Sequence, residues 1–161
     1  MRLITLSGSK HTKKDIVAME LAKNSDCIWI RPYTDITDPV NLEDYQQDLY
    51  IHLNPKQLDA KIKRETPLAE CYVGKHRYVF FENQLVSGYC VLIADDDVVS
   101  YLKRNWNGEL VTVKCHSKDE KYSERNLLSD DEFDIIFNVD DGDYEELSEL
   151  VGDIYLTGGD S

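Results

Sequence analysis

The residues with the clearest chemical pattern follow the first apolar run of the chain. This run, Leu3–Ser7, stops at Gly8, and a polar loop then leads to Lys14, where a helical pattern begins. Such an order is typical of a phosphate-binding loop, in which backbone N–H groups and a lysine ammonium surround phosphate oxygens. We predict that a bound anion would meet these residues: Gly8, Ser9, Lys10, Lys13, Lys14 and Asp15.

The loop departs at two positions from the phosphate-loop pattern G-x-x-x-x-G-K-[ST]. Gly8 and Lys14 match it, but Lys13 stands where the second glycine is expected, and Asp15 replaces the hydroxyl residue. A lysine costs about 1–2 kcal/mol more than glycine if the backbone there must be left-handed. The pattern therefore indicates a fold that binds phosphate and leaves catalysis open.

The elements that must position this loop alternate between strand and helix. β-Branched and aromatic runs predict strands, and helical spacing of apolar residues predicts the helices between them. The predicted strands are Leu3–Ser7, Cys27–Arg31, Tyr50–Leu53, Tyr72–Val73 with Tyr78–Phe81, Tyr89–Ala94, Leu110–Cys115 and Asp134–Val139. The predicted helices are Lys14–Lys23, Pro55–Lys63, Val98–Lys103 and Asp143–Leu150.

Runs such as Val91–Ile93 and Asp134–Phe137 are apolar enough to be buried on both faces, as strands of a parallel sheet are. We therefore predict an α/β fold with a mainly parallel central sheet, flanked by helices on right-handed crossovers. The 161 residues suit a single domain over 1–156, followed by a flexible tail at 157–161.

Composition excludes several classes of protein. No apolar stretch reaches membrane-spanning length, and no secretory segment precedes the first strand, so we expect a cytoplasmic protein without a membrane partner. The four cysteines and four histidines are scattered without metal-ligand spacing, which predicts reduced thiols and no zinc site. A net charge of -13 argues against direct nucleic-acid binding, which depends on Lys and Arg.

The negative charge is concentrated in the last third of the chain, where no Lys or Arg follows Arg125. Charge runs usually form a solvated face that keeps a protein soluble. The alternative is an acidic surface that docks onto a basic protein partner or imitates the phosphates of DNA. Both interpretations stay open.

Beyond the first loop, the chain resembles guanylate kinases in four segments that occur in the same order. The first two resemble the nucleoside-monophosphate-binding insert of that family, the third its Asp-x-Asp strand and the fourth the strand before its last helix. The segments are Tyr50–Leu58, Ile62–Tyr78, Gly88–Asp96 and Phe133–Asp140. The loop Leu6–Asp15 also resembles that of phage deoxynucleoside monophosphate kinases, which carry Gly-Lys-Asp.

This resemblance implies a P-loop nucleoside monophosphate kinase fold with a monophosphate-binding insert over about 32–82. It also implies ATP and Mg²⁺ as cofactors. Lys14 would contact the β and γ phosphates, while Asp95 or Asp96 would orient the Mg²⁺ shell. Asp95–Asp97 could equally be a helix N-cap.

For the acceptor nucleotide, the resemblance implies a pocket lined by Tyr50, Glu70 and Tyr78, with Arg31 at the acceptor phosphate. Glu70 would accept hydrogen bonds from guanine. Tyrosines in strands also serve ordinary packing, so the pocket role of Tyr50 and Tyr78 has a structural alternative.

The chain lacks several cations that phosphoryl transfer uses in guanylate kinases. Their lid arginines lie between the last two strands, where Ser117–Asp131 offers only Lys118, Lys121 and Arg125. Losing one such arginine can cost about a thousandfold in rate. Two hypotheses follow. One is a nucleoside monophosphate kinase acting on GMP or a deoxynucleotide, with Lys14, Arg31 and Arg125 as its catalytic cations. The other is an inactive, acidic interaction or inhibitory protein of the same fold.

Overall fold

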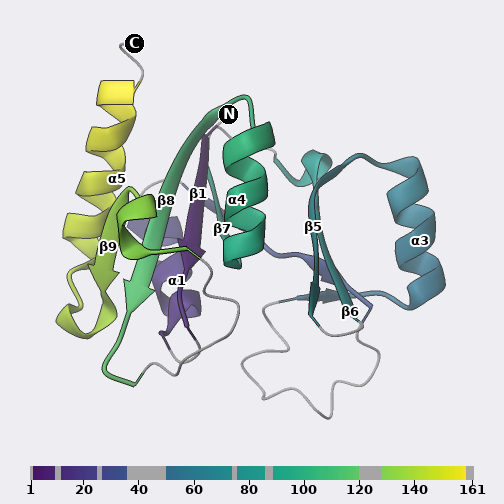
Figure 1. Ribbon diagram of the computed structural model, residues 1–161, viewed down its shortest axis with the longest axis horizontal. Helices are drawn as coiled ribbons and strands as arrows, with labels where there is room; N and C mark the ends of the chain where they lie inside the picture. Colours follow the sequence, from purple (N-terminus) through teal and green to yellow (C-terminus); the bar gives the residue numbers. More distant parts are fainter. Residues whose placement is uncertain are drawn as a thin grey trace. The chain divides into compact units, whose positions relative to one another are not determined.

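The computed structural model describes residues 2–9, 12–24, 27–35, 50–73, 76–85, 89–119 and 128–158 (Figure 1). The chain forms two compact units. The first joins Met1–Trp29 to Ser87–Ser161, and the second is Ile30–Val86. The predicted insert at 32–82 falls within the bounds of the second unit. Each unit is described by itself below.

The larger sheet has five strands in the order β2-β7-β1-β8-β9. These strands are β1 (Arg2–Ser7), β2 (Ile28–Ile30), β7 (Tyr89–Ile93), β8 (Glu109–His116) and β9 (Ile135–Asn138). Strand β1 pairs in parallel with both β7 and β8, and β8 pairs in parallel with β9. The predicted α/β architecture with a mainly parallel central sheet is confirmed.

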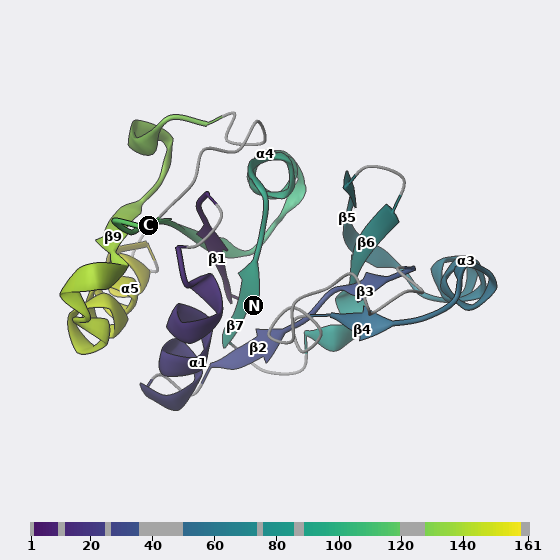
Figure 2. The same ribbon diagram turned by 90° about the horizontal axis from the view of Figure 1, so that it is seen from below.

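Three helices cover this sheet: α1 (Lys14–Asn24), α4 (Asp96–Asn105) and α5 (Tyr144–Gly158). Figure 2 shows α4 on one face of the sheet and α1 with α5 on the other. Ile4, Leu6 and Val113 from the strands meet Leu21 and Leu147 from the helices in one buried cluster. Because both faces are covered, the central strands β1 and β7 are apolar along most of their length.

The second unit is built on a four-stranded sheet in the order β4-β3-β6-β5. Its elements are β3 (Tyr33–Thr34), β4 (Ile51–His52), α3 (Pro55–Arg64), β5 (Pro67–Val73) and β6 (His76–Phe81). Helix α3 begins with a capping box between Asn54 and Gln57, and Leu58 buries its apolar side against Val79 and Phe81. The β5–β6 pair is antiparallel and has a register shift between Pro67 and Ala69.

The structure corrects two details of the predicted elements. Strand β9 alternates between buried and exposed residues, with Ile136 48% exposed, because it is an edge strand of the sheet. Helix α5 continues to Gly158, so the tail predicted from Thr157 starts too early. Val151 is 1% exposed, and no proline follows it to stop the helix.

Two other sequence-based expectations can be compared with the described residues. All four cysteines are free thiols, as predicted. No helix within the described ranges is long and apolar enough to cross a membrane.

Helix α5 provides a matched test of the fold. Leu147 is fully buried in the core, whereas Leu150, one turn later, is 41% exposed. We expect Leu147→Ala to lower the free energy of unfolding by about 2–4 kcal/mol, since it removes buried methyl groups and leaves a cavity. Leu150→Ala should change it by less than about 1 kcal/mol. Urea denaturation of both variants measures this, and equal effects would contradict the packing of α5 described above.

Candidate functional site

The phosphate-loop residues lie at the carboxyl end of β1, in the turn between β1 and α1. Gly8 has φ 149°, and a Cβ atom placed there would lie 2.6 Å from the Cys115 carbonyl oxygen. Any other residue would therefore clash with the backbone at the end of β8. The loop is held further by the Thr12 hydroxyl, which donates to the Ser9 carbonyl over 2.9 Å. Lys10 lies outside the described residues.

The backbone of Lys13 is left-handed, with φ 55°. Among the described residues, no other side-chain-bearing residue has a positive φ. The strain that the sequence analysis attached to this position is therefore present, at about 1–2 kcal/mol. The Lys13 side chain is exposed. A lysine therefore occupies a left-handed position at which glycine would be unstrained.

Lys14 is the first residue of α1, and its Nζ donates to the Gly8 carbonyl over 2.7 Å. Burial lowers the pKa of this ammonium, and the negative charge of Asp95 opposes the shift. The side chain therefore bridges the two ends of the loop and places a half-buried positive charge between them. A phosphate oxygen could replace the Gly8 carbonyl as its acceptor.

The two predicted Mg²⁺ residues have different surroundings. Asp95 is the N-cap of α4, although its side chain makes no capping hydrogen bond, and it is partly buried near Lys14. Asp96 is 2% exposed, and its Oδ2 accepts the Leu128 N–H over 2.9 Å. Asp96 Oδ2 also lies 3.9 Å from Lys114 Nζ.

The carboxylates at this site could bind Mg²⁺ only together with waters and the phosphates of a nucleotide. Within the described ranges, no group of three or more His, Cys, Asp or Glu side chains could hold a metal. Mg²⁺ is commonly bound through one or two carboxylates, waters and substrate phosphates. Asp95 is partly exposed and lies near Lys14, whereas Asp96 is 2% exposed, so Asp95 is the more accessible of the two carboxylates to a hydrated ion.

Lys114 is the residue at this end of the sheet that sequence reasoning missed. It is opposite Ser7 in the β1–β8 pairing, and it is 3% exposed. Strand β8 otherwise appears as an apolar run, so a lysine within it had no motif to mark it. The signal available in the sequence is a charged residue inside a run that is otherwise typical of a buried strand.

The second unit brings together some of the residues predicted for the acceptor nucleotide. The rings of Tyr50 and Tyr78 lie 5.0 Å apart between centroids, tilted by 56°. Tyr78 is 9% exposed, and it pairs with Thr34 of β3 and Cys71 of β5. Arg31 is exposed, and its carbonyl accepts a hydrogen bond from Gln84.

Glu70 lies on the opposite face of the same strand pair. It is opposite Val79, while Ala69 and Cys71 are the β5 residues opposite Phe80 and Tyr78. Side chains of directly opposed residues share a face, and neighbours along a strand alternate. The structure therefore separates Glu70 from Tyr78 and places it on the side of α3.

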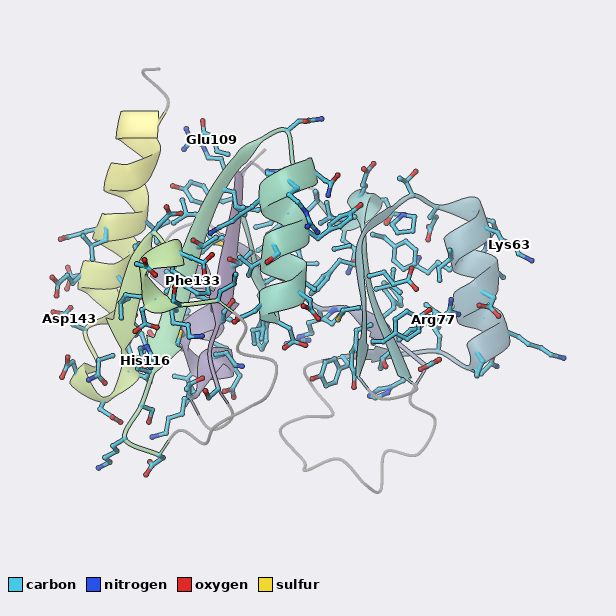
Figure 3. All side chains as sticks on the ribbon, viewed as in Figure 1. Lys63, Arg77, Glu109, His116, Phe133 and Asp143 are labelled. Atoms are coloured by element: carbon cyan, nitrogen blue, oxygen red, sulfur yellow. The ribbon has the colours of Figure 1, made fainter. Side chains whose placement is uncertain are left out.

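Arg77, which the sequence analysis did not single out, explains where Glu70 is held. Its Nη1 lies 4.0 Å from Glu70 Oε1, and its Nη2 pairs with Asp59 of α3. Figure 3 shows Arg77 between the β5–β6 pair and α3. The hydrogen bond with Asp59 raises the pKa of Arg77. Through this contact Arg77 joins β6 to α3.

Arg125, predicted as a lid cation, lies outside the described residues, as does Lys121. Lys118 lies inside them, just after β8. Its backbone N–H donates to Asp140, whose carboxylate also accepts from the Ser117 hydroxyl. These bonds tie the end of β8 to η4 (Val139–Asp141), the turn that precedes α5.

No protein-family model matches the sequence, and no curated protein sequence is similar to it. Solved structures do match the fold. A crystal structure of guanylate kinase from Anaplasma phagocytophilum superposes with a TM-score of 0.64 at 13% identity. The match covers 97% of this chain and 85% of that one. At this identity the match establishes the fold, which is that of a guanylate kinase, and it extends over nearly the whole chain.

The left-handed turn at Lys13 can be tested through stability. We expect Lys13→Gly to raise the free energy of unfolding by about 0.5–1 kcal/mol, because relief of left-handed strain exceeds what glycine costs in the unfolded chain. Lys13→Ala is the matched control, since it removes the long side chain but keeps the Cβ. Thermal and urea denaturation report both variants. A gain for Lys13→Ala equal to that for Lys13→Gly would show that side-chain charge, not backbone strain, limits stability here.

Proposed function

We propose that the chain is a nucleotide-binding protein related in function to nucleoside monophosphate kinases, with ATP as the phosphoryl donor and GMP or a deoxynucleoside monophosphate as the acceptor. The observation that carries this proposal is the loop from Gly8 to Lys14. It keeps a strained left-handed residue at Lys13 and a half-buried ammonium at Lys14. Strain of this kind persists where the surrounding structure imposes it, and it concentrates at binding sites.

In this proposal, Lys14 exchanges its bond to the Gly8 carbonyl for oxygens of the β and γ phosphates. Asp95, near Lys14, would hold Mg²⁺ through water, and the ion would neutralise charge on the phosphates. Tyr50 and Tyr78 offer a paired aromatic surface for the acceptor base. Arg31 and Arg125 are the proposed cations for the acceptor and transferred phosphates.

Phosphoryl transfer depends mainly on positioning and on cations around the transferring group. Ser117–Asp131 supplies at most three cations, and the described part of that segment contributes only Lys118. We therefore propose that nucleotide binding is retained more fully than turnover.

A second function is supported by a different observation. A groove between α1 and α5 is lined mainly by carboxylates and tyrosines, and exposed apolar side chains lie on the same two helices. The groove residues are Glu20, Tyr89, Gly142, Asp143, Tyr144, Glu145, Ser148 and Glu149, and the exposed apolar residues are Ile16, Met19 and Leu150. This surface suits a basic protein partner, so an inactive interaction protein is the competing proposal.

The anion site is tested by Lys14→Ala. We expect ATP·Mg²⁺ to bind this variant more weakly by about 1.5–3 kcal/mol, the scale of a charge-assisted hydrogen bond. Lys23→Ala is the matched control, because Lys23 is an exposed lysine in the last turn of the same helix. Its Nζ lies 3.9 Å from Glu20 Oε1, so this variant also removes one cation with an acidic neighbour. Isothermal titration calorimetry measures both. If the unmutated protein has no measurable affinity for ATP or GMP, the kinase-like proposal fails and the interaction protein remains.

The face on which Glu70 lies predicts how base choice responds to mutation. Because strand pairing puts Glu70 on the α3 side, we expect Glu70→Gln to leave the ratio of GMP to dTMP affinity unchanged within about twofold. Tyr78→Ala should weaken both nucleotides together, since stacking does not depend on base identity. A selective loss of GMP binding in Glu70→Gln would show that this carboxylate contacts guanine.

A further inference from the structure

We propose that Lys114 is a second buried cation of the anion site and that it binds the terminal phosphate of a nucleoside triphosphate. This inference rests on the proposed function, and it assigns a role to a residue outside the phosphate-loop pattern.

The strand register places Lys114 at the base of the loop. β8 runs parallel to β1, and Lys114 is opposite Ser7, the last residue before Gly8. The next residue, Cys115, provides the carbonyl against which Gly8 packs. The positive charge of Lys114 also contributes to lowering the pKa of Lys14, as expected of two cations near each other. Two lysines from different elements therefore converge on the carboxyl end of β1.

The ammonium of Lys114 is buried beside one carboxylate and one aromatic ring. Its side chain is 4% exposed, and its Nζ lies 3.9 Å from Asp96 Oδ2. It also lies 5.1 Å from the centroid of the ring of Phe133, which is labelled in Figure 3. At 3.9 Å the contact with Asp96 is an ion pair and is longer than a hydrogen bond. An ammonium has three donors, so it can bind a phosphate oxygen at this position while Asp96 stays close to it.

Asp96 does not depend on Lys114 for a hydrogen bond. Its Oδ2 accepts the Leu128 N–H over 2.9 Å, and it lies in the first turn of α4, where the helix dipole favours a carboxylate. Lys114 can therefore turn from Asp96 to a phosphate oxygen without leaving that carboxylate unpaired. The neighbouring Cys115 adds no opposing charge, because burial raises the pKa of its thiol to about 12.

Lys114 also fits what the rest of the chain lacks. The segment that carries lid arginines in guanylate kinases is short in this sequence. A cation that arises from β8 reaches the phosphate end of the site from the sheet and needs no lid. Lys14 would hold the phosphate chain near the loop, and Lys114 would meet only its terminal group.

The experiment compares ATP with ADP by calorimetry, both with Mg²⁺, in the unmutated chain and in Lys114→Met. We expect this variant to bind ATP about 10- to 100-fold more weakly, the effect of losing a charge-assisted hydrogen bond, and to bind ADP within about threefold of the unmutated protein. Lys114→Arg should recover most of the ATP affinity. A purely structural role for Lys114 would instead weaken ATP and ADP equally.

The matched control is Lys103→Met. Lys103 also places its Nζ over the Phe133 ring, at 5.9 Å, but it is exposed and donates to the Glu132 carbonyl. Its substitution should leave both affinities unchanged. If Lys114→Met fails to fold, Lys114→Gln, which keeps a polar side chain without the charge, should show the same selective loss of ATP.

The outcomes separate this inference from the proposed function. Suppose that the unmutated chain binds ATP and ADP, and that Lys114→Met binds both with the affinities of the unmutated chain or with an equal loss for each. Lys114 is then not a phosphate ligand, and the proposed nucleotide site stands. If the unmutated chain binds neither nucleotide, the proposed function fails, and this inference fails with it.

Discussion

The close approach of Gly8 to the Cys115 carbonyl is the contact on which the candidate anion site depends. At 2.6 Å from a would-be Cβ, this approach leaves no room for a side chain. It holds Gly8 against the end of β8, and α1 begins at Lys14. Lys13, directly before that helix, has a left-handed backbone. The loop therefore combines a contact that only glycine fits with a strained residue at its other end.

The charges at the carboxyl end of the sheet are balanced as well as concentrated. Lys14 lies near Asp95 and Asp96, and Lys114 Nζ lies 3.9 Å from Asp96 Oδ2, so both lysines have carboxylates beside them. Burial of these groups strengthens every interaction among them, because the surrounding dielectric is low. In a chain with a net charge of -13, such local compensation lets an anion approach a region that the whole-molecule charge would otherwise repel.

The fold could be predicted from the sequence because its signals are local and repeated. Apolar runs such as Val91–Ile93 mark covered strands, and Asn54-Pro55 marks the start of a helix through its capping residues. The loop could be located for the same reason. Lys114 and Arg77 could not, because their roles depend on partners distant in sequence, Asp96 for one and Asp59 for the other. Glu70 shows a further limit of prediction from sequence. Its spacing to Tyr78 resembles the pattern of guanylate kinases, but the pairing of β5 with β6 determines the face on which it lies.

The pairing of β5 with β6 also has an evolutionary consequence. Because side chains alternate along a strand, a slip of one residue between β5 and β6 would exchange the two faces of β5. Glu70 would then share a face with Tyr78, and Ala69 and Cys71 would turn toward α3. The register shift already present between Pro67 and Ala69 is a place where a single insertion or deletion could be absorbed. A single change of register would thus place a carboxylate beside the tyrosine pair, and it would also turn the buried Leu68 to the other face of the strand.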